Sequence, residues 1–286
     1  MVMRQVVGMS ADGSTITLER FQGDLDWSIS SNDLKQSRKA MFLDLETTGI
    51  NASKDKIIDI GYVIFSYHKE TGEILGIEKE FSQQQDPGVP LSEKIKKLTG
   101  YKDEDLQGKQ IDWSEVKADF DKVDVIIAHN AAFDRSFADK ILTVSQDKIW
   151  ACSMTQIAWL DKGHRSKSLE NLAHDHGFFF QGHTALMDVK ASLYLINRKD
   201  PDTSQTYFFE LLSNARISSK WVIAFGASFE MRQELKDRGY MWDPGSRVWK
   251  IAVPVNNSEE EDFLQSHPLA GHAQVKNIRL VDHFKV

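Results

Sequence analysis

The chain has 286 residues, 41% hydrophobic and 27% charged, which is typical of a globular protein somewhat longer than one domain. Its formal net charge of −7 argues against a protein that coats nucleic acid through a generally basic surface. It has no apolar run of about eighteen residues, so we expect no membrane span. The single cysteine, Cys152, excludes an intrachain disulfide framework and favours a cytoplasmic location.

The negative charge is concentrated in the middle of the chain. From Ala40 to Asp202 there are 20 Lys and Arg residues against 27 Asp and Glu residues, which accounts for the whole excess of seven. The flanking segments balance at 5 against 5 and 10 against 10. A segment that holds divalent cations has such an excess, and so does an ordinary acidic surface.

Residues 1–39 are interpreted as an N-terminal extension. Arg4–Met9 and Ser14–Phe21 alternate enough to predict two short strands around a turn at Asp12-Gly13. The polar segment Ser30–Lys39 predicts a linker. The extension begins without a continuous apolar stretch, so we expect no secretory signal.

The first group of chemically active residues follows this extension. Ala40–Leu45 is a short apolar run that predicts a strand ending in the turn Thr47–Gly49. Because side chains alternate along a strand, Asp44 and Glu46 lie on the same face. Two neighbouring carboxylates disfavour each other's ionisation without a counter-charge, and the turn can offer amides to a ligand. A strand that simply runs into an acidic turn has the same pattern.

Strands are predicted next at Lys56–Tyr67 and Ile74–Phe81, which form an antiparallel meander with the first. Helices are predicted at Ser92–Leu98 and Ser114–Phe120, each with its serine in the N-cap position. Val123–Ala128 then predicts a buried strand.

A second polar group comes directly after that buried strand. His129, Asn130 and Asp134 lie where the strand ends and a helix over Phe133–Leu142 is predicted to begin. The carboxyl ends of strands are where α/β folds gather functional groups. Asp134 can equally cap the helix, and His129 and Asn130 can be ordinary hydrogen-bonding loop residues.

The elements that follow alternate between strand and helix. Lys148–Cys152 predicts a strand, whereas Met154–Leu160, Ser168–His176 and Thr184–Asn197 predict helices. Three hairpin-like strands followed by this alternation predict a mixed α/β sheet.

A third polar group lies at the start of the last of these helices. His183 precedes the helix, and Asp188 lies one turn into it. A histidine titrates near neutral pH and can act as a general base. A carboxylate on such an apolar helix requires a partner, and a metal ion is one. Taken alone, the pair is equally explained by an exposed loop histidine and a solvent-facing aspartate.

The three groups together supply four carboxylates and one histidine, each at a strand end or a helix start. Hard divalent cations require oxygen ligands from carboxylates and water. Two such cations can clamp the attacking and leaving oxygens of a phosphoryl displacement, while His183 takes a proton from the attacking water.

The sequence resembles the DEDDh 3′→5′ exonucleases of the RNase H-like fold. The resemblance is carried by Phe42–Ile50 (FLDLETTGI), Ala128–Asp134 (AHNAAFD) and His183–Asp188 (HTALMD), in the order and spacing of that family. It extends over roughly residues 40–198. Within the family the sequence is most similar to the proofreading exonuclease subunit of bacterial replicative polymerases, and less so to oligoribonuclease and the tRNA-trimming relatives.

This resemblance implies a mixed five-stranded sheet with flanking helices and two Mg²⁺ or Mn²⁺ ions. It makes Asp44 and Asp188 ligands of one ion, Asp134 a ligand of the second, Glu46 a metal ligand near the phosphate, and His183 the general base. Asp59 stands where the family often has Glu, and we expect only a local change in packing there. Contacts to the substrate are expected from Thr47, Thr48, Gly49, His129, Asn130 and Phe133.

A basic loop, Lys162–Lys167, precedes the helix predicted at Ser168–His176. Its Arg165 is a candidate to grip the nucleic-acid backbone. A solvated loop is the alternative interpretation.

The polar break after Lys199 divides the chain into a catalytic domain over residues 40–202 and a small α/β module over residues 203–286. In the module, strands are predicted at Trp221–Phe225, Tyr240–Trp242, Val248–Val253 and Val275–Phe284, and helices at Phe229–Arg238 and Glu259–Gln265. Aromatic side chains beside Arg and Lys in this module could stack on single-stranded bases. The alternative is that most of these aromatic side chains fill a small core.

The main hypothesis is a stand-alone exonuclease that acts on single-stranded DNA and releases nucleoside monophosphates. A 3′→5′ exoribonuclease is one alternative, because nothing in the sequence decides between the two sugars. A nucleic-acid-binding protein that has lost activity is the other, and the intact set of five residues argues against it. No clamp-binding tail is evident, so association with a polymerase is left open.

Overall fold

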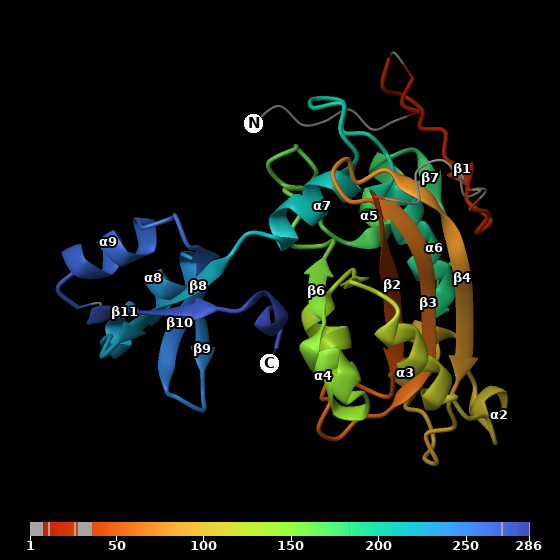
Figure 1. The fold of residues 1–286 in the computed structure, drawn as a ribbon, viewed down its shortest axis with the longest axis horizontal. Helices are drawn as coiled ribbons and strands as arrows, with labels where there is room; N and C mark the ends of the chain where they lie inside the picture. The colour runs from red at the N-terminus through yellow and green to blue at the C-terminus, as the bar shows by residue number, and fades with distance from the viewer. Residues whose placement is uncertain are drawn as a thin grey trace. The chain divides into compact units, whose positions relative to one another are not determined.

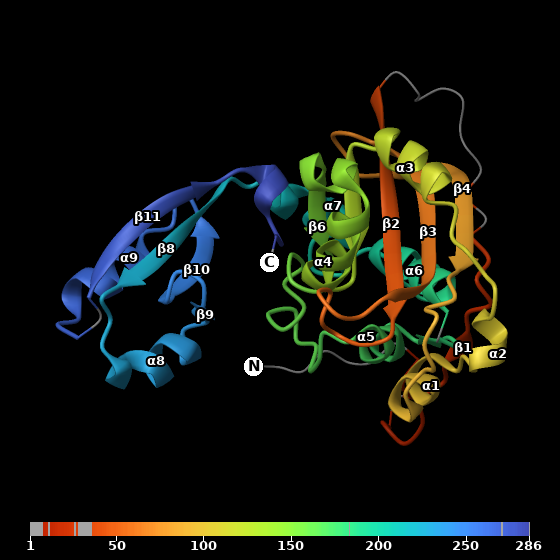
Figure 2. The same ribbon diagram turned by 90° about the horizontal axis from the view of Figure 1, so that it is seen from below.

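The computed structural model describes residues 8–10, 12–25, 27, 36–182, 184–269 and 271–285. The chain divides into two compact units, one of Met1–Ala215 with Phe284–Val286 and the other of Arg216–His283. Figures 1 and 2 show the elements of both units. Several predicted features lie outside the described residues, namely His183, Arg4–Val7 of the expected hairpin and most of the expected linker.

A mixed five-stranded sheet forms the first unit, in the order β4-β3-β2-β5-β6 (Figure 2). The three long strands are antiparallel neighbours, and β5 and β6 run parallel to β2. The predicted α/β fold with this sheet is therefore confirmed. The strands are β2 (Ser37–Thr47), β3 (Ile57–His68), β4 (Ile74–Gln84), β5 (Val125–Ala128) and β6 (Ile149–Cys152).

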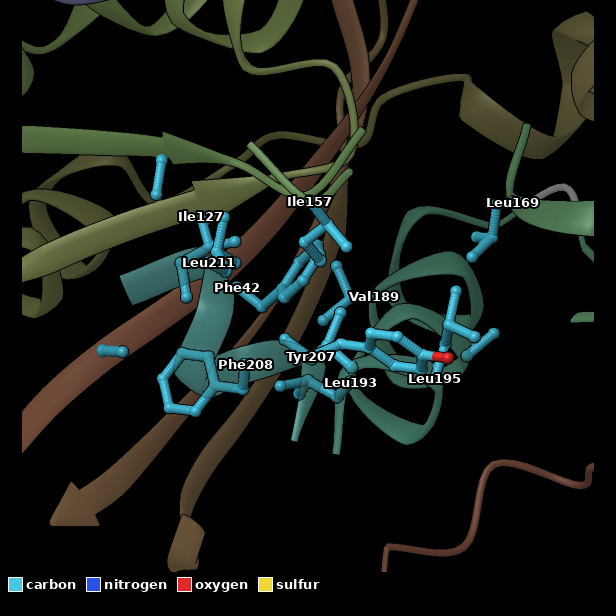
Figure 3. Close-up of a cluster of buried hydrophobic side chains, with 14 of the residues drawn as sticks. Phe42, Ile127, Ile157, Leu169, Val189, Leu193, Leu195, Tyr207, Phe208 and Leu211 are labelled. Atoms are coloured by element: carbon cyan, nitrogen blue, oxygen red, sulfur yellow. The ribbon is translucent and has the colours of Figure 1, made fainter. Parts of the chain in front are cut away.

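Helices cover both faces of this sheet. Successive side chains of β2 point to opposite faces, and each face is buried in its own hydrophobic core. Ala40 and Phe42 belong to the core under α5, α6 and α7, part of which is drawn in Figure 3. Met41 and Leu43 belong to the core under α3 and α4. The helices are α1 (Glu93–Thr99), α2 (Asp103–Leu106), α3 (Trp113–Asp121), α4 (Ala131–Ile141), α5 (Leu169–Asp175), α6 (Ala185–Ile196) and α7 (Tyr207–Ala215), with a 3₁₀ turn at Thr143–Asp147.

The N-terminal extension is more closely tied to the sheet unit than the sequence indicated. Met9 and Ile16 form an isolated antiparallel bridge, whereas β1 (Glu19–Arg20) pairs in parallel with β7 (Phe178–Phe179). The linker predicted over Ser30–Lys39 is wrong at its C-terminal end, because strand β2 already begins at Ser37. Strand β3 is long enough to pair with the start of β2, since its last residue, His68, is the partner of Ser37.

Two local predictions in the first unit are wrong. Helix α3 is capped by Asp112 and not by Ser114, since the Asp112 carboxylate accepts hydrogen bonds from the amides of Ser114 and Glu115. The segment Met154–Leu160 forms turns and no helix. Its backbone is held instead by side chains: Gln156 accepts from the Cys152 amide at 2.8 Å, and the Trp159 indole donates to the Ser153 carbonyl at 2.7 Å.

The boundary expected after Asp202 lies instead after Ala215. Helix α7 packs Tyr207, Phe208 and Leu211 into the core of the first unit, as Figure 3 shows. The sequence analysis predicted no helix there and assigned these residues to the second module.

The second unit is a four-stranded antiparallel sheet in the order β11-β8-β10-β9, accompanied by two helices. The strand predicted over Val275–Phe284 is shorter than expected and gives way to a 3₁₀ turn at Leu280–Asp282. No helix among the described residues of either unit is long and apolar enough to cross a membrane. The elements are β8 (Ser219–Phe225), a 3₁₀ turn (Phe229–Met231), α8 (Arg232–Asp237), β9 (Met241–Asp243), β10 (Val248–Pro254), α9 (Glu259–Ser266) and β11 (His272–Ile278).

Candidate active site

Three carboxylates meet at the end of the central strand. Asp44 and Glu46 of β2 and Asp188 of α6 each offer one oxygen atom, and these atoms lie within 4.8 Å of one another. Asp44 and Glu46 have the same parity as Phe42, so their side chains leave the sheet on the face that α6 covers. The alternation of the strand therefore explains why these two residues meet the helix that carries Asp188.

Gly61 allows this helix to lie close to the sheet. It is paired with Asp44 in the β2–β3 register. A Cβ atom at Gly61 would lie 2.2 Å from the Leu186 nitrogen and 2.4 Å from the Ala185 carbonyl carbon. Only glycine fits against the backbone of α6 here, and the first turn of α6 carries Asp188. The sequence offered one signal for this role, a glycine inside the otherwise apolar strand KIIDIGYVIF.

Asp134 reaches the site from the opposite face of the sheet. It lies in the first turn of α4, is 2% exposed, and accepts a hydrogen bond from the Leu45 amide at 3.1 Å. Leu45 stands between the two carboxylates of β2. Asp134 therefore fixes the backbone that carries Asp44 and Glu46, and it lies outside the 4.8 Å cluster.

Asp59 has a larger role than the local packing that we expected from the sequence. It is fully buried on β3, opposite Glu46, and accepts hydrogen bonds from the Tyr101 hydroxyl at 2.7 Å and the Gln84 amide at 3.0 Å. It also accepts from the Ala185 amide at 3.1 Å. Thr184 makes no side-chain cap, so Asp59 satisfies the first amide of α6 from another strand.

The carboxylates of the site are electrostatically strained. Burial, followed by the charges of Asp134 and Asp188, raises the pKa of Asp44 well above its usual value. Burial, followed by the charges of Asp188 and Asp59, raises the pKa of Glu46 to about 8. Burial raises the pKa of Asp134 to about 7. Among the described residues, no ion pair involves Asp44, Glu46 or Asp134, so this negative charge lacks a protein counter-charge.

This donor set fits a divalent cation. Carboxylate oxygens are the ligands that Mg²⁺ and Mn²⁺ prefer, and an ion would supply the positive charge that the cluster lacks. The residues that could hold it are Asp44, Glu46 and Asp188, with Asp134 beside them.

The turn after β2 is held by a residue that the sequence analysis missed. Asp55 accepts hydrogen bonds from the Asn51 amide at 2.7 Å and the Thr48 hydroxyl at 3.5 Å. A Cβ atom at Gly49 would lie 2.5 Å from the Asp55 carboxylate, so a larger residue there would displace that carboxylate. Thr47 is buried and donates its hydroxyl to the Gly49 carbonyl at 2.5 Å. The predicted substrate residues Thr47, Thr48 and Gly49 thus form one braced turn beside the cluster.

The three polar and aromatic residues predicted around α4 differ in accessibility. Both ring nitrogens of His129 are bonded within the protein, to the Ser153 hydroxyl and the Lys167 carbonyl, each at 2.8 Å. Burial lowers the pKa of His129, which favours the neutral ring, and its two hydrogen bonds hold the loop in place. Asn130 is exposed at the N-cap of α4 without a side-chain cap bond. The half-buried Phe133 contacts Phe137, with ring centres 5.2 Å apart.

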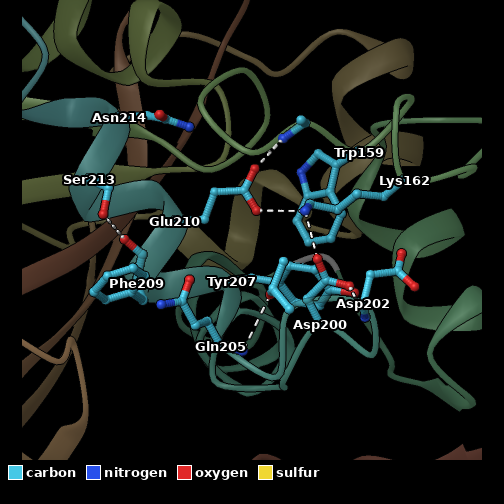
Figure 4. A network of polar contacts seen from close by, with 12 residues as sticks. Trp159, Lys162, Asp200, Asp202, Gln205, Tyr207, Phe209, Glu210, Ser213 and Asn214 are labelled. Atoms are coloured by element: carbon cyan, nitrogen blue, oxygen red, sulfur yellow. Dashed lines mark hydrogen bonds and ion pairs between the residues drawn. The ribbon is translucent and has the colours of Figure 1, made fainter.

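The basic loop is mostly structural. Lys162 makes ion pairs with Asp200 at 2.7 Å and Glu210 at 2.9 Å, as Figure 4 shows. His164 is buried and bonded to Asp175 at 2.8 Å. Within the loop Lys162–Lys167, Arg165 is the residue that is exposed.

A mixed five-stranded sheet whose central strand ends in a carboxylate cluster, with a helix packed across it, is the arrangement expected of the RNase H-like fold. Residues 41–196 match the model of the RNase T exonuclease family. Because this match spans more than half of the chain, the chain belongs to that exonuclease family. The family predicted from the three motifs is thereby confirmed.

Two curated relatives and one solved structure extend this finding. The chain is 29% identical over 185 residues to the PolC-type DNA polymerase III of Bacillus subtilis (strain 168), covering 62% of this chain and 12% of the relative. It is 36% identical over 107 residues to the PolC-type DNA polymerase III of Streptococcus pyogenes serotype M5 (strain Manfredo), covering 37% and 7%. The chain thus spans a small part of the length of these polymerases.

The solved structure is that of E. coli exonuclease I in complex with a dT13 oligonucleotide. The two structures are similar with a TM-score of 0.53 at 16% identity, over 86% of this chain and 64% of that chain. At this identity the likeness shows a shared fold.

Proposed function

We propose that this chain is a metal-dependent 3′→5′ exonuclease that removes nucleotides from the 3′ end of single-stranded DNA and releases nucleoside 5′-monophosphates. The observation that carries the proposal is the cluster of Asp44, Glu46 and Asp188 within 4.8 Å. Membership of the exonuclease family supports hydrolysis from an end. The relatives are named as DNA polymerases, and exonuclease I is bound to an oligothymidylate, which favours DNA over RNA.

Each residue has a defined task in this proposal. Asp44, Glu46 and Asp188 would hold two Mg²⁺ or Mn²⁺ ions, which would supply the positive charge that stabilises the developing negative charge on the phosphate. Asp134 accepts the Leu45 amide and would help to hold the second ion.

The proton and the sugar are handled by other groups. His183, five residues before Asp188, takes the proton from the attacking water, a role that rests on its motif. The turn Thr47–Gly49, braced by Asp55, binds the terminal nucleotide through its backbone. The exposed Asn130 and Arg165 contact the phosphates, and the edge of Phe133 supports a base.

The test uses single strands of identical sequence in DNA and RNA, labelled at the 3′ or the 5′ end, with Mg²⁺, Mn²⁺ or EDTA. We expect the 3′ label to leave in the first product and the 5′-labelled strand to shorten stepwise. EDTA and Asp44→Ala should abolish both effects. Asp147→Ala, which removes an exposed aspartate outside the site, is the matched control and should retain full activity.

The outcomes separate the alternatives. Faster shortening of RNA than of DNA would replace the proposed substrate with RNA. Shortening from the 5′ end would contradict the direction. If no substrate is degraded with either metal while the chain still binds DNA, the chain is a binding protein with a retained exonuclease fold.

A further inference from the structure

The sheet of the second unit has two faces of different character. Val222, Ala224 and Val253 point to one face and form a small core with Leu235 of α8 and Leu264 of α9. This face is the one that the two helices cover. Because residues alternate along each strand, the residues between them point to the opposite face.

The strand register defines that opposite face, which we call the open face. Trp221, Ile223 and Phe225 of β8 occupy its centre. On one side Lys276, Gln274 and His272 of β11 are their partners, and on the other side Lys250 of β10 is opposite Ile223. None of these residues belongs to the core that packs against α8 and α9.

The open face presents aromatic rings beside cations. Phe225 is 46% exposed, and its ring centre lies 5.2 Å from that of His272. The Lys250 ammonium lies 4.8 Å from the centre of the Trp221 ring. Lys276, opposite Trp221, is exposed and makes no ion pair among the described residues. Exposed rings and ammonium groups on one surface are the combination that binds bases and phosphates.

Charge is segregated between the two sides of this unit. The four strands contain a single acidic residue, Asp243, which pairs with Lys250 at 2.7 Å. Apart from Asp243 and Asp282, the acidic residues of the unit lie in the helical segments: Glu230, Glu234, Asp237, Glu259, Glu260, Glu261 and Asp262. Most of the negative charge is therefore on the helical side. On the open face Asp243 pairs with Lys250, and Lys276 makes no ion pair among the described residues.

We propose that the open face binds single-stranded DNA. Bases stack on Phe225 and on the exposed part of Trp221, and Lys276 contacts the phosphates. The two rings are four residues apart on β8, or about 13 Å at roughly 3.3 Å per residue, so a strand of several nucleotides is needed to reach both. The choice of DNA rests on the proposed function.

The experiment measures binding of the full chain to a fluorescent oligothymidylate of about 20 nucleotides and to a dinucleotide, in EDTA to prevent hydrolysis. We expect Phe225→Ala to weaken binding of the long strand about fivefold or more, in line with the known size of base–aromatic stacking. Lys276→Ala should weaken it measurably, because a phosphate contact is lost. Lys276→Ala should also reduce the salt dependence of binding. Dinucleotide hydrolysis in Mg²⁺ should be unchanged.

Matched controls lie on the same unit but away from the open face. Phe229→Ala removes a phenylalanine that is 77% exposed, and Lys236→Ala removes an exposed lysine on α8. Both should bind the long strand like the unmodified chain. Equal affinity of Phe225→Ala, Lys276→Ala and both controls would overturn the proposal, and tighter binding of an oligouridylate than of oligothymidylate would overturn the choice of DNA.

Failure of this inference is distinguishable from failure of the proposed function. Binding in EDTA requires no catalysis. If the chain binds through Phe225 and Lys276 but hydrolyses no substrate, the proposed exonuclease activity is rejected and DNA binding by the open face is retained. If the chain shortens DNA while Phe225→Ala and Lys276→Ala bind it normally, DNA binding by the open face is rejected and the exonuclease activity is retained.

Discussion

The carboxyl of Glu46 keeps its proton to a much higher pH than an ordinary glutamate, because burial and then the charges of Asp188 and Asp59 raise its pKa from 4.5 to about 8. The folded chain therefore holds a proton in this pH window that the unfolded chain has released. By linkage, the contribution of Glu46 to stability is fully present below pH 4.5 and is lost as the pH rises from 4.5 towards 8. Without metal, the site destabilises the protein at neutral pH.

We expect Glu46→Gln to raise the melting temperature of the metal-free chain at pH 8 and to make little difference near pH 5. A gain of about 1 kcal/mol corresponds to roughly 2–4 °C for a domain of this size. Scanning calorimetry in EDTA measures it, with Asp147→Asn as an exposed control. Saturating Mg²⁺ should reverse the order, because the variant has lost a ligand. A lower melting temperature for Glu46→Gln than for the unmodified chain, in EDTA at pH 8, would show that the charged Glu46 carboxylate does not destabilise the metal-free protein.

Asp59 leads to a second prediction at this scale. Removing its carboxylate leaves the Ala185 amide and the Tyr101 hydroxyl without their acceptor, which costs roughly 1–3 kcal/mol for each buried group. We expect Asp59→Ala to lower kcat more than tenfold, because the start of α6 loses its anchor. Tyr101→Phe removes one of the same hydrogen bonds and leaves the α6 contact intact, so it should cost much less. Equal kcat values for the two variants would contradict the role of Asp59 in positioning α6.

The sequence predicted the residues that form the carboxylate cluster and missed those that hold them in place. Asp44, Glu46 and Asp188 could be found because carboxylates at strand ends and helix starts follow a recognisable pattern. The functions of Asp55 and Asp59 depend on partners at Gly49 and Ala185, which only the folded chain brings near. His129 was expected to contact substrate because its two internal bonds, to Ser153 and Lys167, are likewise invisible in the sequence.

At the scale of elements, the decisive contact is the close packing of α6 against β3 at Gly61. We expect Gly61→Ala to force the helix away from the strand, since the added Cβ atom would meet backbone atoms that cannot rotate aside. Overpacking of this kind costs roughly 1–3 kcal/mol or more. Because Asp188 moves with the helix, affinity for Mn²⁺ should fall at least about tenfold, measured by calorimetric titration.

Gly245→Ala is the control for this substitution. The nearest atom to its added Cβ is a side-chain oxygen of Asp243 at 3.3 Å, in the second unit. Normal Mn²⁺ affinity in Gly61→Ala would show that α6 does not need to lie so close to the sheet.

Elements were predictable where burial gives a strand or helix its own pattern. The apolar runs of β2, β3 and β5 revealed the sheet, because these strands are buried on both faces. The segment Met154–Leu160 has an apolar composition that also suits a helix, but Gln156 and Trp159 hold it in turns through hydrogen bonds to the backbone. Helix α7 was missed because it directly follows a polar break that was interpreted as a domain boundary.

At the scale of the whole chain, polar contacts explain why the first unit extends to Ala215. Glu210 accepts from the Ala158 amide at 2.9 Å and pairs with Lys162, as Figure 4 shows. Asn214 donates to the Gln156 carbonyl at 2.8 Å. These three contacts join α7 to the turns after β6, so α7 belongs to the first unit.

This assignment predicts different fates for two truncated chains. Residues 1–202 lack the buried side chains Tyr207, Phe208, Leu211 and Leu212, which contribute roughly 6–12 kcal/mol at 1.5–3 kcal/mol each. That loss is comparable with the whole stability of a domain, about 5–15 kcal/mol. We therefore expect residues 1–202 not to fold.

Residues 1–215 keep α7 and should fold and hydrolyse a dinucleotide at nearly the rate of the full chain. The part of the first unit that they lose is Phe284–Val286, of which Phe284 is only partly buried. Circular dichroism during thermal unfolding tests folding, and dinucleotide hydrolysis in Mg²⁺ tests the site. If residues 1–202 fold and are active, the domain boundary lies at Asp202. If residues 1–215 do not fold, the second unit is needed for the stability of the first.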